Sequence, residues 1–105
     1  MGSPVYFGTM AAELKSLVDE SVKHYGKFTG KVGGAFASSG AIGGGTETTV
    51  LDILKAMLIH GMIVQGTSQR DHYGPVAIGA PDDRATNECR KLGRNVAELA
   101  VRLHG

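Results

Sequence analysis

The stretch that decides the fold runs from Lys31 to His60. It opens with the apolar run Lys31-Val-Gly-Gly-Ala-Phe-Ala37, continues through the loop Ser38-Ser-Gly-Ala-Ile-Gly-Gly-Gly45, and enters a long apolar-periodic segment at Thr46. These features predict a strand, a glycine-rich turn and a helix. Ligands of open parallel sheets sit beyond the carboxyl ends of the strands, and glycines let the backbone approach a flat or anionic ligand without Cβ clashes. The glycine loop is therefore the first candidate binding site.

Length, charge and cysteine content limit the classes of function. The 105 residues suffice for one domain, residues 1–105, and the net charge is +1 with acids and bases interspersed. This balance predicts no nucleic-acid partner and no membrane surface as a partner, and no apolar run approaches the roughly 20 residues of a membrane helix. The single cysteine, Cys89, cannot form an internal disulfide, and no secretory signal opens the sequence. Both features favour a cytoplasmic location.

The residues ahead of the deciding stretch predict a loop followed by a helix. Met1 to Gly8 carries turn formers and two aromatics before any periodicity, so we expect a loop there and no strand. Thr9 is a good N-cap, and a helix is expected from Met10 to about Tyr25. Its apolar face carries Met10, Leu14, Leu17, Val18 and Val22.

After the glycine loop the pattern predicts a second helix and a second strand. The helical stripe is Val50, Leu51, Leu54, Met57 and Leu58. It ends before Gly61, which stands in the usual position just past a helix end. Met62 to Gly66 then reads as an apolar strand. Because a helix separates them, this strand and Lys31 to Ala37 should be parallel neighbours in a right-handed crossover.

The polar stretch Thr67 to Pro75 lacks periodicity and is the second candidate site loop. We expect it at the same sheet edge as the glycine loop. His72 and Tyr73 within it either face a substrate or are solvated, and both interpretations stay open. Val76 to Gly79 follows as a short strand or as a continuation of the loop.

The last helix has the cleanest pattern in the chain. Pro81-Asp82-Asp83 predicts its start, and its apolar positions recur with 4-3-4-3-4 spacing at Ala85, Cys89, Leu92, Val96, Leu99 and Leu103. Cys89 is therefore expected to be a small core residue, and Arg84 to lie on a solvated face. The order helix, strand, helix, strand, helix is α/β. Two principal strands cannot cover three amphipathic helices, so we expect part of the sheet to be missing.

Four segments together resemble the C-terminal portion of flavodoxin-like flavoproteins, most closely the NAD(P)H:quinone oxidoreductases of the tryptophan-repressor-binding-protein type. They are Gly2 to Lys15, Gly34 to Thr49, His60-Gly-Met-Ile-Val64 and Tyr73-Gly-Pro-Val-Ala-Ile-Gly79. Their order and spacing make the match specific, and it covers essentially the whole chain.

The resemblance implies a truncated flavodoxin-like fold, a three-layer parallel sheet, that binds FMN between two loops. It implies that four residues of the first loop lie along the isoalloxazine ring, and that six backbone positions of the glycine loop contact its polar edge and the ribityl region. The first set is Pro4, Val5, Tyr6 and Phe7, and the second is Ser39, Gly40, Ala41, Gly43, Gly44 and Gly45. It also implies that His60 approaches the flavin, often from a neighbouring subunit.

The implied activity is electron transfer of the NAD(P)H:quinone oxidoreductase type, with NAD(P)H as donor and a quinone-like acceptor. The protein mainly orients the cofactor in such chemistry, so no side-chain acid or base is obligatory. The family's phosphate-binding loop, which holds FMN at a helix N-terminus, has no counterpart upstream of Met1. We therefore expect weak FMN binding. The rival interpretation is a half-flavodoxin structural or assembly module that no longer binds FMN tightly.

Three further expectations concern His60, metals and assembly. From the residues alone, His60 fits equally well a helix C-terminal residue that interacts with the helix dipole. The four histidines lack ligand spacing and a carboxylate cluster, so no metal site is expected. Missing strands would leave one edge of Lys31 to Ala37 unpaired. This predicts a homodimer in which two such edges build one sheet across a two-fold axis.

Overall fold

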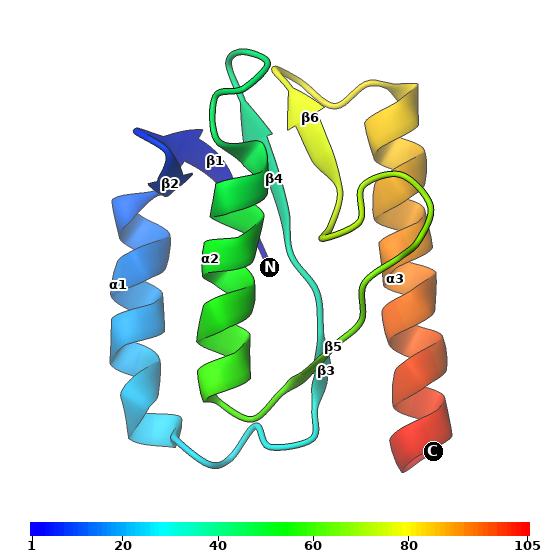
Figure 1. The fold of residues 1–105 in the computed structure, drawn as a ribbon. Coiled ribbons are helices and arrows are strands. Elements are labelled where there is room, and N and C mark those ends of the chain that lie inside the picture. The colour runs from blue at the N-terminus through cyan, green and yellow to red at the C-terminus, as the bar shows by residue number, and fades with distance from the viewer.

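Three parallel strands form the centre of the fold: β1 (Gly2–Tyr6), β4 (Phe36–Ser39) and β6 (Val76–Ile78). The strand β4 pairs with β1 on one side and with β6 on the other. An antiparallel hairpin adds β2 (Thr9–Met10) to β1, so the strand order is β2-β1-β4-β6. The computed structural model describes residues 1–105 (Figure 1).

A second sheet contains only β3 (Val32–Gly33) and β5 (Ile63–Val64). The two strands run parallel, with Val32 opposite Ile63. The predicted parallel pairing of the segments around these residues is confirmed, although the paired part of each strand is only two residues long.

The helices cover the main sheet on two sides. The helix α1 (Ala12–Glu20), with the 3₁₀ turn η1 (Ser21–His24) at its end, lies beside α2 (Thr46–Ile59) in Figure 1. The long helix α3 (Asp83–His104) lies on the opposite face, where Phe36 and Ala77 of the sheet line one cavity together with Ala85 of the helix. This arrangement is the predicted α/β, flavodoxin-like layering.

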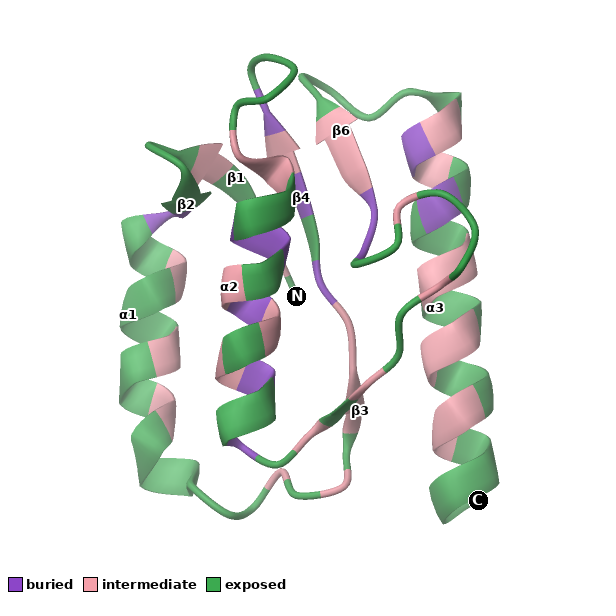
Figure 2. Cartoon of the chain, in the orientation of Figure 1, coloured by how far each residue is buried: buried purple, intermediate pink, exposed green.

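The core lies between α2 and β4. The helix buries Thr49, Val50, Ile53 and Met57, whose spacing defines one face, and these pack near Ala35 and Ala37. Figure 2 shows buried residues along α2, β4 and the start of α3, whereas α1 has no fully buried residue. The α1 face therefore contributes less to the core than its periodicity suggests.

Two predicted helix ends are confirmed and one differs. The N-cap Asp82 accepts a hydrogen bond from the N–H of Ala85 at 2.8 Å, and Gly61 has a φ of 77° just past α2. The predicted N-cap Thr9 instead lies in β2, where its hydroxyl donates to Asp52 at 2.7 Å. The helix α1 begins at Ala12 without a side-chain cap.

The prediction of a loop from Met1 to Gly8 is wrong, because Gly2–Tyr6 forms a strand. Gly2 lies opposite Phe36 in the sheet, and a Cβ at Gly2 would be 2.0 Å from the Phe36 ring. Because Gly2 has no side chain, the Phe36 ring can lie over this part of β1. Pro4 is tolerated because β2 pairs only with the last two residues of β1, which leaves Pro4 on an edge. The expected count of two principal strands is thereby corrected.

The open strand edge predicted at Lys31 to Ala37 is wrong for β4 only, because β3 (Val32–Gly33) pairs with β5 alone and has no strand partner on its other side. Both sides of β4 are occupied, since Phe36 and Ala37 pair with β1 and Ala37 also with β6. The segment is moreover divided between two sheets at Ala35. The strand β1, which is distant in sequence, occupies the side of β4 that was expected to be open.

The prediction that Cys89 belongs to the core is wrong as well. Its side chain is exposed and lines a cavity of about 280 Å³ with Phe36 and Pro4. The cavity lies between this part of α3 and the sheet, so the side chains there do not pack closely enough to bury the thiol.

None of the helices is both long and apolar enough to cross a membrane.

Candidate functional site

Two loops meet at the carboxyl ends of β1 and β4, at the upper end of the view in Figure 1. The hydroxyl of Thr48, in the first turn of α2, donates to the carbonyl of Gly8 at 2.9 Å. A Cβ at Gly45 would be 3.1 Å from the Cα of Gly8 and 3.3 Å from a methyl of Val5. The turn after β1 and the glycine loop are therefore in contact, as the resemblance implies.

The turn after β1 presents two aromatic side chains to solvent. Phe7 is fully exposed and has a φ of 53°, a conformation that is unusual for a bulky residue. Tyr6 is 62% exposed, and Pro4 is exposed as well, whereas Val5 packs against the core. Tyr6 and Phe7 are thus free to cover a flat ligand, and Val5 supports the turn from below.

The glycine loop holds its shape through its own backbone. The Ser39 hydroxyl donates to the carbonyl of Ala41 at 2.7 Å, and the N–H of Gly44 donates to the same carbonyl at 3.1 Å. Gly43 and Gly45 have φ values of 76° and 113°, which favour glycine. Residues 40–44 are exposed.

The start of α2 leaves hydrogen-bond donors without a side-chain cap. Its N-cap is Gly45, which has no side chain to accept from the first turn. The first N–H groups of a helix have no intrahelical acceptor and carry a partial positive charge. The arrangement can therefore bind polar or anionic atoms of a ligand that approaches the glycine loop.

His60 lies at the other end of α2, about 22 Å from Gly45 if each residue step of the helix rises about 1.5 Å. Its side chain is buried, with 9% of the residue exposed, and its Nε2 is 2.7 Å from the Ser21 hydroxyl. Because Ser21 donates its proton to the carbonyl of Val18, Nε2–H donates to Ser21, while Nδ1 is buried without a partner. Phe28 packs edge-on against the ring at 5.1 Å.

Within one chain, His60 and the glycine loop therefore cannot share a ligand. The histidine follows the last residue of α2 as its C-cap, which agrees with the helix-end interpretation. Its role as a cofactor residue remains a prediction that needs a second chain.

The Thr67 to Pro75 loop brings His72 and Tyr73 to the first turns of α2. Together with Glu47 and Val50 they line a cavity of about 250 Å³. The Nδ1 of His72 is 2.8 Å from the carbonyl of Thr67. Because a carbonyl only accepts, Nδ1–H is the donor of this hydrogen bond. Both side chains are exposed, and their rings meet edge-on at 6.5 Å.

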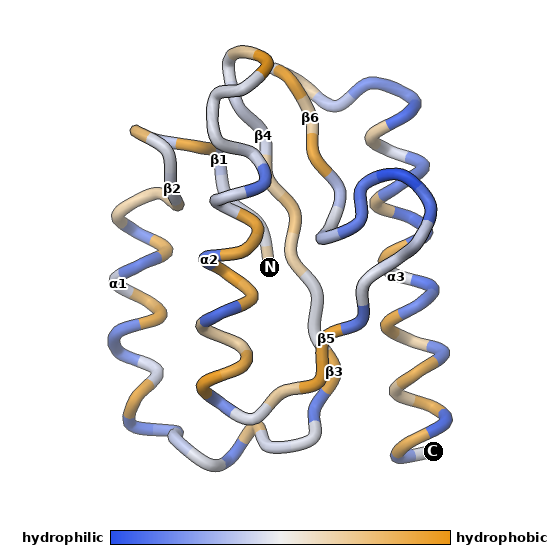
Figure 3. The backbone as a smooth tube through the Cα atoms, in the orientation of Figure 1, coloured by the Kyte–Doolittle hydropathy of each residue, from blue (hydrophilic) through white to orange (hydrophobic).

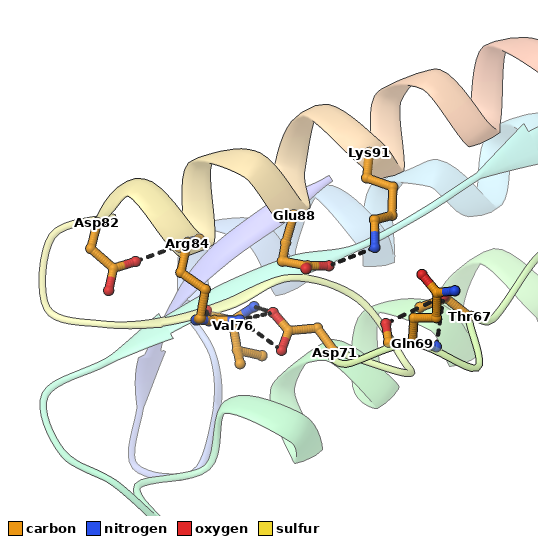
Figure 4. A network of polar contacts seen from close by, with 9 residues as sticks. Thr67, Gln69, Asp71, Val76, Asp82, Arg84, Glu88 and Lys91 are labelled. Carbon is orange, nitrogen blue, oxygen red and sulfur yellow. Dashed lines mark hydrogen bonds and ion pairs between the residues drawn. The ribbon is translucent and has the colours of Figure 1, made fainter.

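A polar network beside this loop was not expected from the sequence. Arg84 donates to both carboxylate oxygens of Asp71 at 3.0 Å (Figure 4), and the bond to Asp71 raises the pKa of the guanidinium. The only signal in the sequence is an Asp in a polar loop and an Arg at the start of the next helix, which local periodicity cannot connect. No three His, Cys, Asp or Glu side chains converge as a metal-binding group.

The fold and the paired loops define a flavodoxin-like protein. The solved structure of a WrbA-like flavodoxin from Agrobacterium tumefaciens matches with a TM-score of 0.85 and 25% identity, over 97% of this chain and 64% of that one. The model of the NADPH-dependent FMN reductase family matches residues 1–70, and the chain belongs to this family.

Two relatives show how much of such proteins the chain spans. It is 43% identical to an iron-sulfur flavoprotein of Methanocaldococcus jannaschii, over 94% of this chain and 56% of the relative. It is 32% identical to an NAD(P)H dehydrogenase (quinone) of Archaeoglobus fulgidus, over 97% of this chain and 58% of the relative. The chain thus spans less than two thirds of the length of these relatives.

Proposed function

We propose that the chain supplies the isoalloxazine-binding side of an FMN-dependent NAD(P)H:quinone oxidoreductase in the cytoplasm. The observation that carries the proposal is the contact between the glycine loop and a turn with a fully exposed Phe7. Family membership favours this redox function over a purely structural half-flavodoxin module.

The residues present fit the ring of FMN. Tyr6 and Phe7 offer flat apolar faces that exclude water from a flavin, and a Cβ at Gly40 or Gly43 would meet no atom within 4 Å, so the loop surface is open. The uncapped N–H groups at the start of α2 would donate to the polar edge of the ring. Among residues 1–105 we assign none to the phosphate.

When bound, FMN supplies the hydride and electron transfer between a nicotinamide donor and a quinone-like acceptor. The protein's part is to orient the ring, to exclude water and to supply hydrogen-bond donors. His72 can hold a proton at Nε2 beside the cavity next to Glu47. The acceptor would enter this cavity, between the loop and the first turn of α2.

The test is reduction of a soluble quinone by NADH or NADPH with the FMN-supplemented protein. We expect FMN-dependent turnover that is lost in Phe7→Ala, because that change removes the exposed ring and leaves the sheet pairing intact. A folded protein that neither binds flavin nor reduces the quinone at saturating FMN would overturn the proposal.

We further propose a homo-oligomer, at least a dimer. Two features support association: β3 has a strand partner on one side only, and several apolar side chains of the helices are exposed. Val22 and Ile59 are 70% and 71% exposed, and burying such apolar side chains in an interface removes them from water. Light scattering at micromolar concentration tests this proposal, and a cooperatively unfolding monomer of 11.0 kDa would contradict it.

A further inference from the structure

The outer edge of β6 is covered by two side chains in place of a neighbouring strand. On the inner side, the carbonyl of Pro75 accepts from Ala37 and the N–H of Gly79 donates to Ser39. Backbone groups of a strand point alternately to its two sides, so the N–H and the carbonyl of Val76 point to the outer side of β6, away from β4. The Val76 N–H donates to Asp71 at 3.1 Å, and its carbonyl accepts from Arg84. The ion pair therefore satisfies both backbone groups of Val76.

One guanidinium consequently joins three elements: the Thr67 to Pro75 loop, β6 and the start of α3. Its Nη1 bonds the carboxylate of Asp71 and its Nη2 bonds the backbone of Val76. The Asp71 side chain is 12% exposed and that of Arg84 is 38% exposed. A planar, forked donor suits this double contact, which an ammonium group could not reproduce.

The loop itself is closed by local bonds. The N–H of Thr67 donates to the carbonyl of His72 at 3.1 Å, and the His72 ring donates back to Thr67. Gly74 leaves no space for a side chain, because its Cβ would be 2.1 Å from the carbonyl oxygen of Ala35. Figure 3 shows this loop as largely hydrophilic, and only its last two residues, Gly74 and Pro75, are buried. The side-chain hydrogen bonds that tie it to the rest of the chain all pass through Asp71.

We propose that Arg84 and Asp71 form a clamp that positions His72 and Tyr73 beside the first turn of α2. Arg84 is a positioning residue for the acceptor cavity and does not itself line that cavity. The inference rests on the proposed function of the loop as the surface that faces a flat, quinone-like acceptor. Loosening the clamp would weaken acceptor binding while the flavin site around Phe7 and Gly45 stays intact.

The position of the loop can be measured without any ligand. The sequence has no tryptophan, so Tyr73→Trp introduces a single fluorescent probe. We expect iodide to quench this probe more strongly in Arg84→Gln and Asp71→Asn, and the double variant to be no worse than either single one, because both break the same contact. Arg84→Lys should be intermediate. Arg90→Gln, an exposed position on the same helix, is the matched control and should leave quenching unchanged.

The kinetic readout separates the clamp from general damage. In Arg84→Gln without the probe, we expect the KM for the quinone to rise about tenfold, the size expected for loss of a charge-assisted hydrogen bond, with kcat and the Kd for FMN unchanged. Unchanged quenching in Arg84→Gln or in Arg84→Lys would overturn the clamp. A looser loop with an unchanged KM would overturn its role at the acceptor cavity. If no variant and no parent protein reduces quinone, the proposed function fails, and the quenching data still decide whether the clamp positions the loop.

Discussion

The two ends of α2 differ in how their polar groups are satisfied. At the start, Gly45 provides no cap, and the loop before it is exposed. At the end, His60 is buried against Ser21 and Phe28. Both ends carry residues that resemble a flavin site in sequence. The start of α2 therefore keeps hydrogen-bond donors and a flat apolar surface free for a ligand, whereas the His60 ring uses Nε2 within the fold and leaves only Nδ1 without a partner.

The first prediction concerns the phosphate of FMN, for which a binding site would give the largest difference in affinity. Because no residue of the chain is assigned to it, the 105-residue protein should bind FMN and riboflavin with Kd values that agree within about threefold. A phosphate site would add several charge-assisted hydrogen bonds of about 1.5 to 3 kcal/mol each. Titration by flavin fluorescence quenching gives both constants. A strong preference for FMN would show that the glycine loop and the start of α2, or residues near them, bind the phosphate.

The second prediction concerns the end of α2 that carries His60. His60→Ala removes a buried ring and its bond to Ser21, so the free energy of unfolding should fall by about 2 to 4 kcal/mol. Flavin affinity of the folded fraction should not change. Urea unfolding and flavin titration measure the two quantities, and His24→Ala at an exposed position serves as the control. Loss of flavin binding without loss of stability would assign His60 to the cofactor after all.

The third prediction tests whether a ligand approaches the glycine loop. Gly40→Val adds a side chain where a Cβ meets nothing, so flavin affinity should fall about tenfold, or about 1.4 kcal/mol, with stability unchanged. Gly93→Val in α3 also meets nothing and is the matched control. Gly44→Val is a poorer test, because its Cβ would be 2.9 Å from the Ala41 carbonyl and would disturb the loop itself. Equal affinity in Gly40→Val and its control would move the flavin away from this loop.

The sequence predicts the helices well because their signals are local. The extent of α2 and the cap at Asp82 need no distant partner to be recognised, although the predicted stripe included the exposed Leu51 and Leu58 and omitted the buried Ile53. The strand β1 escaped notice because Gly2 and Pro4 break any alternation, and its stability comes from pairing with Phe36, far along the chain.

The candidate site likewise has parts that the sequence predicts and parts that depend on contacts between distant residues. The resemblance correctly brings the turn at Phe7 and the glycine loop together, since both follow parallel strands. The sequence places His60 at the end of the second helix, as observed, but it does not reveal that His60 is buried against Ser21, nor that Asp71 meets Arg84 across 13 positions. Contacts of this kind depend on where the elements pack, and residue spacing alone does not encode them.

The smallest expected effect is a pH dependence at the open end. The hydroxyl of Thr9 and then Lys55 donate to Asp52, which lowers the pKa of that carboxyl. A lowered pKa in the folded state means that the stabilisation is fully present above the unfolded value of about 3.9 and is lost as the pH falls through the folded value. The contact ties the β1–β2 hairpin to α2, so acid should loosen the turn that carries Phe7.

Urea unfolding at pH 5 and below pH 3 measures this loss of unfolding free energy. The loss should be smaller in Thr9→Val than in the parent, because the variant lacks the hydroxyl that bonds the Asp52 carboxylate. Thr48→Val is the matched control. It removes the hydroxyl that bonds the carbonyl of Gly8 in the same turn, and a carbonyl does not titrate, so its destabilisation should be equal at both pH values. An acid loss in Thr9→Val as large as in the parent would mean that other carboxylates set the acid limb and that the hairpin is held mainly by Thr48 and the backbone.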